Sequence, residues 1–207
     1  NGKVGKGLRF DGGDDYVSMP DSISIDPTSA WTLSAWVKRA ATGTQHSIVE
    51  KYDYLSGKGN YYMRVTSGNL LLAGTLNGSS VDNCGSTLTQ INSGFWYQLV
   101  ATFDSTTNTI KCFVNGNLEA TNSNATLDPP GSDVTLKIGC RANDCGTLMN
   151  GLIDEVKIYN YARTPAQIAW DYNRGAPVAW YKMDECSGTV LHSSNNPYNS
   201  TLNGTLN

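Results

Sequence analysis

Charged residues are scarce in this chain: only 16% of its 207 residues are Asp, Glu, Lys or Arg, and it has two histidines. The 15 basic side chains form no cluster, which argues against nucleic-acid binding. No apolar run approaches the ~20 residues that cross a bilayer, so we expect no membrane insertion. The motifs G-x-S-x-G, the P-loop and H-E-x-x-H are also missing. We therefore predict that the chain is not an enzyme.

Turn-forming and aromatic residues are abundant instead. The chain has 21 Gly and 20 Asn, the residues that adopt positive φ angles most readily, and this predicts many turns between short strands. Its 11 Tyr, 5 Trp and 4 Phe argue against disorder, because they supply enough large side chains for a core.

Apolar and polar residues alternate with a period of two in segments bounded by turn residues. We predict strands at residues 7–11, 16–19, 31–38, 47–51, 60–65, 69–73, 95–103, 108–114, 134–138 and 152–159. Trp36 and Trp96 lie in such strands and are predicted to be core residues. This number of strands predicts an all-β, antiparallel sandwich.

One helix interrupts the strands. Thr164, Pro165 and Gln167 form a capping-box pattern, with Pro at the first helical position. We predict about two helical turns that end at Gly175, with Ile168 on the buried face.

Six segments resemble, in order, the LamG-like jelly-roll family of the concanavalin A-like lectin/glucanase superfamily: GLRFDGGDDYVSMP, WTLSAWVK, FWYQLVATFD, FVNG, LKIG and GLIDEVKIYNYARTPAQI. The resemblance implies a concanavalin A-like antiparallel jelly-roll β-sandwich with one short helix, and we treat residues 1–207 as a single domain. It implies a non-catalytic binding or adhesion module of a secreted or cell-surface protein. The E-x-D-x-x-E pattern of the glucanases in this superfamily is missing from the sequence.

The expected partner is a glycan or a cell-surface protein, and we expect the domain to be part of a larger multi-domain chain. The alternatives are a structural spacer, a protein–protein interaction module, or an accessory domain of a glycan-active enzyme. The fold alone does not decide among these functions.

The last thirty residues resemble the segment that usually begins such a domain. Residues 178–207 either close their own sandwich, as in a circular permutation, or belong to the next of several tandem repeats. We favour closure of the same domain.

A calcium site is the most specific ligand prediction. If Val156 and Ile158 face the core, period two turns Asp154 inward at the start of its strand, and by the same reasoning Glu185 follows the inward residues of the tail. A buried carboxylate needs a cation or several N–H donors. The alternative is that Asp154 merely accepts backbone hydrogen bonds.

The resemblance implies calcium as a structural cofactor, held with help from a loop that contains Asn196. This loop departs from the family pattern, because His192 stands where the family has Asp. Asp14 belongs to a second acidic turn, together with Asp11 and Asp15. Turns rich in Asp are usually no more than turns.

Four tyrosines are candidates for carbohydrate binding: Tyr52, Tyr54, Tyr61 and Tyr62, next to the glycine-containing loop 56–59. Sugars stack their C–H faces on exposed aromatic rings. The alternative is that these tyrosines serve β-sheet formation only.

Five cysteines allow two disulfides with one thiol left over. Cys140 and Cys145 flank a short predicted loop, and we predict a local disulfide between them. The pairing of Cys84, Cys112 and Cys186 is left open by the sequence.

Overall fold

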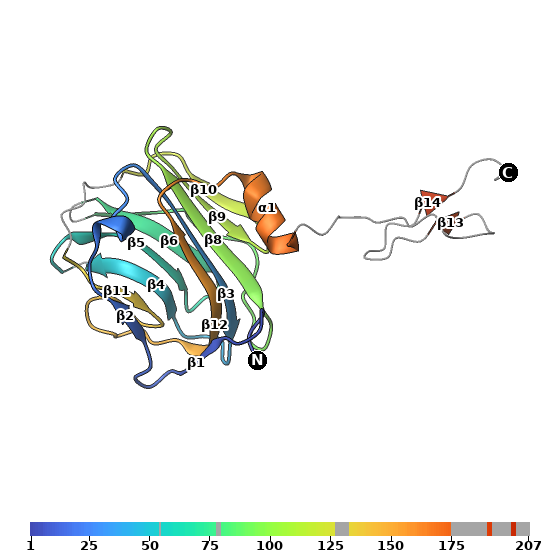
Figure 1. The fold of residues 1–207 in the computed structure, drawn as a ribbon, viewed down its shortest axis with the longest axis horizontal. Helices are drawn as coiled ribbons and strands as arrows, with labels where there is room; N and C mark the ends of the chain where they lie inside the picture. Colours follow the sequence, from blue (N-terminus) through green and yellow to red (C-terminus); the bar gives the residue numbers. More distant parts are fainter. Residues whose placement is uncertain (54, 78–79, 127–132, 175–189, 192–199, 202–207) are drawn as a thin grey trace.

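The computed structural model describes residues 1–53, 55–77, 80–126, 133–174, 190–191 and 200–201. Two antiparallel six-stranded sheets pack face to face, which confirms the predicted sandwich (Figure 1). The first sheet has the order β1 (Leu8–Asp11), β12 (Asn150–Tyr159), β3 (Ala30–Arg39), β8 (Tyr97–Asp104), β9 (Thr109–Val114) and β10 (Asn117–Asn122). The second has the order β2 (Val17–Met19), β11 (Leu136–Ile138), β4 (His46–Asp53), β5 (Lys58–Val65), β6 (Leu71–Asn77) and β7 (Ser80–Asn83).

Three small elements complete the described structure. A 3-10 turn, η1 (Ile23–Ile25), lies between β2 and β3, and β13 (Val190–Leu191) pairs with β14 (Ser200–Thr201) in a separate two-stranded sheet. The single α-helix, α1 (Pro165–Asn173), follows β12. No described helix has the length and apolar character needed to cross a membrane.

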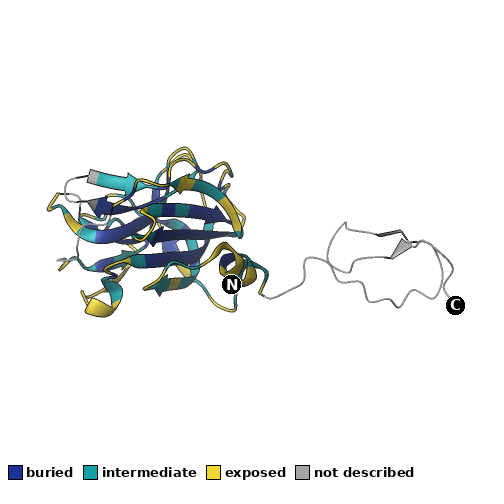
Figure 2. Ribbon diagram, turned by 90° about the horizontal axis from the view of Figure 1, so that it is seen from above, coloured by how far each residue is buried: buried dark blue, intermediate teal, exposed yellow. Residues whose placement is uncertain are grey.

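Alternating side chains exclude water from the space between the sheets (Figure 2). In β3 the inward residues are Trp31, Leu33, Ala35 and Val37, all of them fully buried. The ring of Trp31 lies 5.8 Å from that of Tyr61 in β5 and 6.0 Å from that of Phe103 in β8, between centroids. Aromatic contacts between the two sheets therefore form the centre of the core.

Two strands of the six-stranded sheets, β7 and β10, were not predicted from the sequence, and neither were the short strands β13 and β14. The sequences of β7 and β10, SVDN and NLEATN, are polar and show little alternation. Each is the last strand of its sheet and pairs with one neighbour only, so it needs no continuous apolar face.

The described residues contain two disulfides. One joins Cys140 to Cys145, the pair that the sequence indicated. The other joins Cys84, which follows β7, to Cys112 of β9, and it links the two sheets inside the core across 28 residues. Closing a loop of this size stabilises a fold by about 3–4 kcal/mol in the chain-entropy account. Cys186 lies outside the described residues.

The capping box that begins α1 is confirmed. The Thr164 side chain accepts the Gln167 amide, and the Gln167 side chain accepts the Thr164 amide in return. The helix ends at Arg174, which has the left-handed φ of 52°. Ile168 packs on Val100 and Phe113, so α1 covers part of the outer face of the first sheet.

A buried arginine, Arg39, is the last residue of β3, and every nitrogen of its guanidinium donates a hydrogen bond. Arg39 donates to Nδ1 of His46 at 3.0 Å, to Asn69, and to the carbonyls of Ile91 and Thr44. Burial and the neighbouring guanidinium charge lower the pKa of His46 to about 4. The imidazole is therefore neutral near pH 7 and is able to accept this hydrogen bond.

We predict that the neutral His46 makes the fold sensitive to acid. The unfolded chain binds a proton at this residue near pH 6.5 and the folded chain only near pH 4, so stability falls as the pH drops between these values. The fall is about 1.4 kcal/mol per pH unit. His46→Asn keeps an acceptor for Arg39 but does not titrate, and it should remove this slope. Urea unfolding of both proteins at several pH values tests it, and equal slopes would contradict the assignment.

Candidate functional site

The structure buries three of the four tyrosines that were predicted to form a sugar-binding surface. Tyr61 points into the core and donates its hydroxyl to the Ile25 carbonyl. Tyr62, its neighbour in β5, and Tyr52 of β4 lie on the other side of the second sheet, but both are also buried. The prediction of an exposed aromatic platform is therefore wrong for these three residues. Tyr54 lies outside the described residues.

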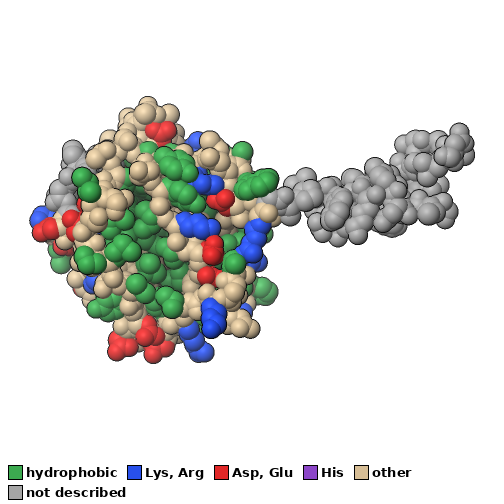
Figure 3. Space-filling model, in the orientation of Figure 1, with side chains coloured by type: hydrophobic (Ala, Val, Ile, Leu, Met, Phe, Trp, Pro, Cys, Tyr) green, Lys and Arg blue, Asp and Glu red, His purple; other side chains and the backbone are tan. Residues whose placement is uncertain are grey.

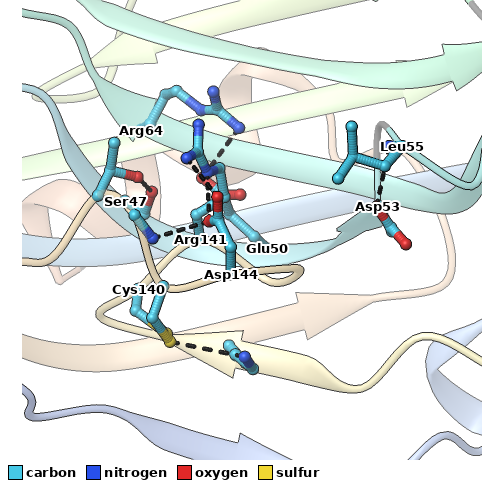
Figure 4. A network of polar contacts seen from close by, with 12 residues as sticks. Ser47, Glu50, Asp53, Leu55, Arg64, Cys140, Arg141 and Asp144 are labelled. Atoms are coloured by element: carbon cyan, nitrogen blue, oxygen red, sulfur yellow. Dashed lines mark hydrogen bonds and ion pairs between the residues drawn. A yellow bond between two sulfur atoms is a disulfide. The ribbon is translucent and has the colours of Figure 1, made fainter.

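A polar network covers the outer face of the second sheet. The Arg64 guanidinium lies 4.4 Å from the ring centroid of Tyr62, and its Nη2 lies 3.0 Å from Oε1 of Glu50, which is fully buried. Figure 4 shows Arg141 and Asp144, from the loop closed by the Cys140–Cys145 disulfide, gathered beside Glu50. Burial raises the pKa of the Glu50 carboxyl, and the Arg64 charge opposes this shift. The protein's own side chains thus occupy this face.

Asp154 does not face the core, so its predicted inward orientation is wrong. The register of β12 against β3 shifts between Asp154 and Lys157, and Glu155 has a φ of 51°. This bulge breaks the period of two, and Ile153 takes the inward position instead. The Asp154 carboxylate accepts the amides of Val4 and Glu155, both at 2.8 Å. These are the backbone hydrogen bonds of the alternative interpretation.

Of the other predicted metal ligands, the structure describes only Asp14. Glu185 and Asn196 lie outside the described residues. Asp14 lies in an exposed turn with Asp11 and Asp15, where one carboxylate oxygen of each lies within 4.8 Å of the others. Asp11 and Asp15 also accept backbone amides of the turn.

A pocket of about 250 Å³ opens between α1 and the outer face of the first sheet; we call it the α1 pocket. The strands β3, β8 and β12 and the helix itself supply most of its lining: Ser34, Trp36, Gln98, Glu155, Lys157, Trp170, Asp171 and Arg174. Val4 completes it.

Two tryptophans line the α1 pocket in different ways. Trp36 points outward from β3 and not into the predicted core; the ring of Tyr172 stacks on it at 5.7 Å and Nζ of Lys3 lies 4.4 Å from its centroid. Trp36 is therefore buried by its neighbours. Trp170 of α1 is 65% exposed, so its ring is accessible to a ligand.

Polar side chains line the α1 pocket together with these rings. Gln98 is almost completely buried, and its Oε1 has no hydrogen-bond partner within the described residues. The two carboxylates are in ion pairs: Glu155 with Lys157 at 2.9 Å and Asp171 with Arg163 at 2.8 Å. The site combines an accessible apolar ring with hydrogen-bonding groups, an arrangement that suits a ligand with both apolar and hydroxyl surfaces.

Comparison with protein-family models finds a match to the concanavalin A-like lectin/glucanases superfamily over residues 11–169. Comparison with curated protein sequences finds no match.

Several solved structures share the fold. Domain 4 of an extracellular arabinanase from Geobacillus stearothermophilus, solved with arabinotriose, has a TM-score of 0.66 and 22% identity, over 83% of this chain and 78% of that one. The CBM40 of a Ruminococcus gnavus sialidase, bound to α2,3 sialyllactose, has a TM-score of 0.64 and 14% identity, over 81% and 97%. A pentraxin from Limulus polyphemus has a TM-score of 0.57 and 17% identity, over 78% of each chain. At these identities the likeness shows the fold alone.

We predict that Arg64→Met destabilises the fold by about 3–5 kcal/mol at pH 7, because it removes the cation that pairs with the buried Glu50 carboxylate. The loss should shrink as the pH falls and Glu50 takes up a proton. Lys58→Met is the matched control, since its pair with Asp133 has side chains 48% and 81% exposed. Exposed pairs contribute about 1 kcal/mol or less. Equal losses in urea unfolding, or a loss independent of pH, would contradict the role of Arg64.

Proposed function

Because the chain belongs to the concanavalin A-like lectin/glucanase superfamily, we propose that it is a non-catalytic module that binds carbohydrate in the α1 pocket. The observation that carries the proposal is that the exposed Trp170 ring and the buried Gln98 amide line the same pocket. Neighbours of the same fold solved with arabinotriose and sialyllactose support this class of ligand.

A sugar ring has an apolar face that can cover the exposed aromatic ring of the pocket, and hydroxyl donors for its buried amide oxygen. Its C–H face stacks on an aromatic ring and removes apolar surface from water. Its hydroxyls donate hydrogen bonds, and Oε1 of Gln98 is an acceptor with no partner within the described residues. A buried polar atom left in this state costs free energy, which a ligand hydroxyl would recover.

The charges of the pocket favour binding over hydrolysis. Glycoside hydrolysis uses one protonated carboxyl group as acid and a second carboxylate as base or nucleophile. In the α1 pocket, Glu155 and Asp171 are each held by a cation, Lys157 and Arg163. Both carboxylates are therefore engaged by neighbouring side chains of the protein and do not form a free pair of the kind that hydrolysis needs.

We propose a secreted or cell-surface location for the module. Two disulfides, Cys84–Cys112 and Cys140–Cys145, support this location. Disulfides persist in oxidising compartments and are rare in the reducing cytosol.

Trp170→Ala should weaken carbohydrate binding by about 2 kcal/mol, roughly 30-fold in Kd, because it removes the stacking surface. Phe95→Ala is the matched control: Phe95 is 66% exposed, as Trp170 is 65% exposed, but it does not line the pocket. A glycan array that includes arabinotriose and sialyllactose identifies the best ligand, and calorimetry measures its Kd. Equal loss in both variants would contradict the site; absence of binding to any glycan would favour a spacer or a protein–protein module.

We also propose calcium as a structural ligand, at the turn of Asp11, Asp14 and Asp15. Their exposed carboxylates support this choice, because Ca²⁺ takes six to eight oxygen ligands from carboxylates, carbonyls and water. Asp154 is less suited, since both of its oxygens already accept backbone amides.

Calcium should raise the melting temperature of the full chain, and a chelator should reverse the rise. Binding to the folded state alone adds ~2.7 kcal/mol at a hundredfold excess over the Kd. Asp14→Asn should abolish the response, whereas Asp154→Asn should lower stability equally in calcium and in chelator. A calcium response that survives Asp14→Asn would contradict this location, and no response in the unmodified chain would contradict calcium binding.

A further inference from the structure

A second pocket, of about 320 Å³, lies over the neighbouring strands β1, β12 and β3; we call it the basic pocket. Arg9 of β1, Lys38 of β3, and Asn150 and Leu152 of β12 line it. Arg39 also lies in its wall, but its guanidinium is used in the buried hydrogen bonds described above. Among the described residues, no Asp or Glu lines this pocket.

The register of the three strands places the two cationic residues on either side of Leu152. The next residue of each strand, or the one before it, faces the core, so Arg9, Lys38 and Leu152 face outward. Leu152 pairs with Arg9 on one side and with Lys38 on the other. Because neighbouring strands are separated by about 4.8 Å, the Cα atoms of the two cationic residues lie about 10 Å apart. The pocket therefore has an apolar floor between two positive charges.

These positive charges have no counter-charge from the protein. The ion pairs of the described residues include neither Arg9 nor Lys38. Figure 3 shows Lys and Arg side chains along the side of the molecule that carries α1, β12 and β1. The whole chain has a net charge of −3, so this local excess of positive charge does not follow from the composition. An anionic group placed between the two side chains would interact favourably with both.

The basic pocket and the α1 pocket belong to the same face of the first sheet. Trp36 and Lys38 are two residues apart in β3, so their Cα atoms lie about 7 Å apart and their side chains point the same way. The N-terminal segment borders both pockets, since Val4 lines the α1 pocket and Gly7 the basic pocket. Nζ of Lys3, 4.4 Å from the centroid of the Trp36 ring, adds a third positive charge to this face. A short oligosaccharide would therefore span both pockets.

We propose that the basic pocket binds an acidic sugar unit, one that carries a carboxylate or a sulfate group, of the oligosaccharide held in the α1 pocket. This assignment rests on the proposed function and names the class of its ligand. The C–H surface of the sugar covers Leu152, and its anionic group accepts charge-assisted hydrogen bonds from Arg9 and Lys38. The planar guanidinium of Arg9 is suited to such a group, because it donates two parallel hydrogen bonds.

The double variant Arg9→Gln/Lys38→Gln tests the charge preference. Calorimetry compares matched pairs of oligosaccharides: a uronate oligomer with its methyl ester, and a sulfated oligomer with its desulfated form. The unmodified chain should bind the acidic member of at least one pair about tenfold more tightly or better, and the pair that responds distinguishes carboxylate from sulfate. The double variant should lose this preference and keep its affinity for the neutral members.

The matched control is Lys58→Gln/Lys137→Gln, which removes the same charge from β5 and β11 of the second sheet and should keep the preference. Equal affinity for the acidic and neutral members, or an unchanged preference in Arg9→Gln/Lys38→Gln, would overturn the assignment and leave carbohydrate binding in the α1 pocket standing. Acidic oligosaccharides that bind Trp170→Ala as tightly as the unmodified chain would also overturn it, because the two pockets would not share a ligand. If no oligosaccharide binds, the proposed function fails, and this assignment fails with it.

Discussion

The exclusion of water from the space between the two sheets determines how the other parts of the structure are arranged. It turns alternate residues of each strand inward, around the cluster of Trp31, Tyr61 and Phe103. It also leaves two outer faces that each need a cover. On the first sheet α1 supplies part of the cover through Ile168, and on the second sheet Arg64 and Glu50 supply it. The α1 pocket exists because the helix covers only part of its sheet.

The two edges of the sandwich keep water out of the core in different ways. On one side a disulfide joins Cys112 of β9 to Cys84 and holds the two sheets together. On the other side, β2 and β12 leave an apolar groove between them.

Local signals in the sequence predicted what depends on a few neighbouring residues. The capping box of Thr164 and Gln167 and the disulfide between Cys140 and Cys145 are of this kind. Ten of the strands were predicted for the same reason, since alternation is visible in any short window, whereas β7, β10, β13 and β14 were not predicted. The Cys84–Cys112 bond joins residues 28 positions apart, and no local pattern distinguishes it from the other pairings.

The candidate site was missed because it depends on tertiary contacts. A single bulge at Glu155 reverses the parity on which the inward orientation of Asp154 was based. Trp36 and Gln98 become neighbours only because β3 lies next to β8, and Trp170 approaches them only because α1 packs back on that sheet. The tyrosines of β4 and β5 looked accessible because the sequence does not show that Arg64 covers Tyr62.

The proposed function requires that carbohydrate binds in the α1 pocket. A crystal structure of the full chain with the oligosaccharide that it binds best would show where the sugar lies. We expect the sugar ring to stack on Trp170, with a hydroxyl within hydrogen-bond distance of Oε1 of Gln98. A sugar bound elsewhere, with the α1 pocket empty, would contradict the account.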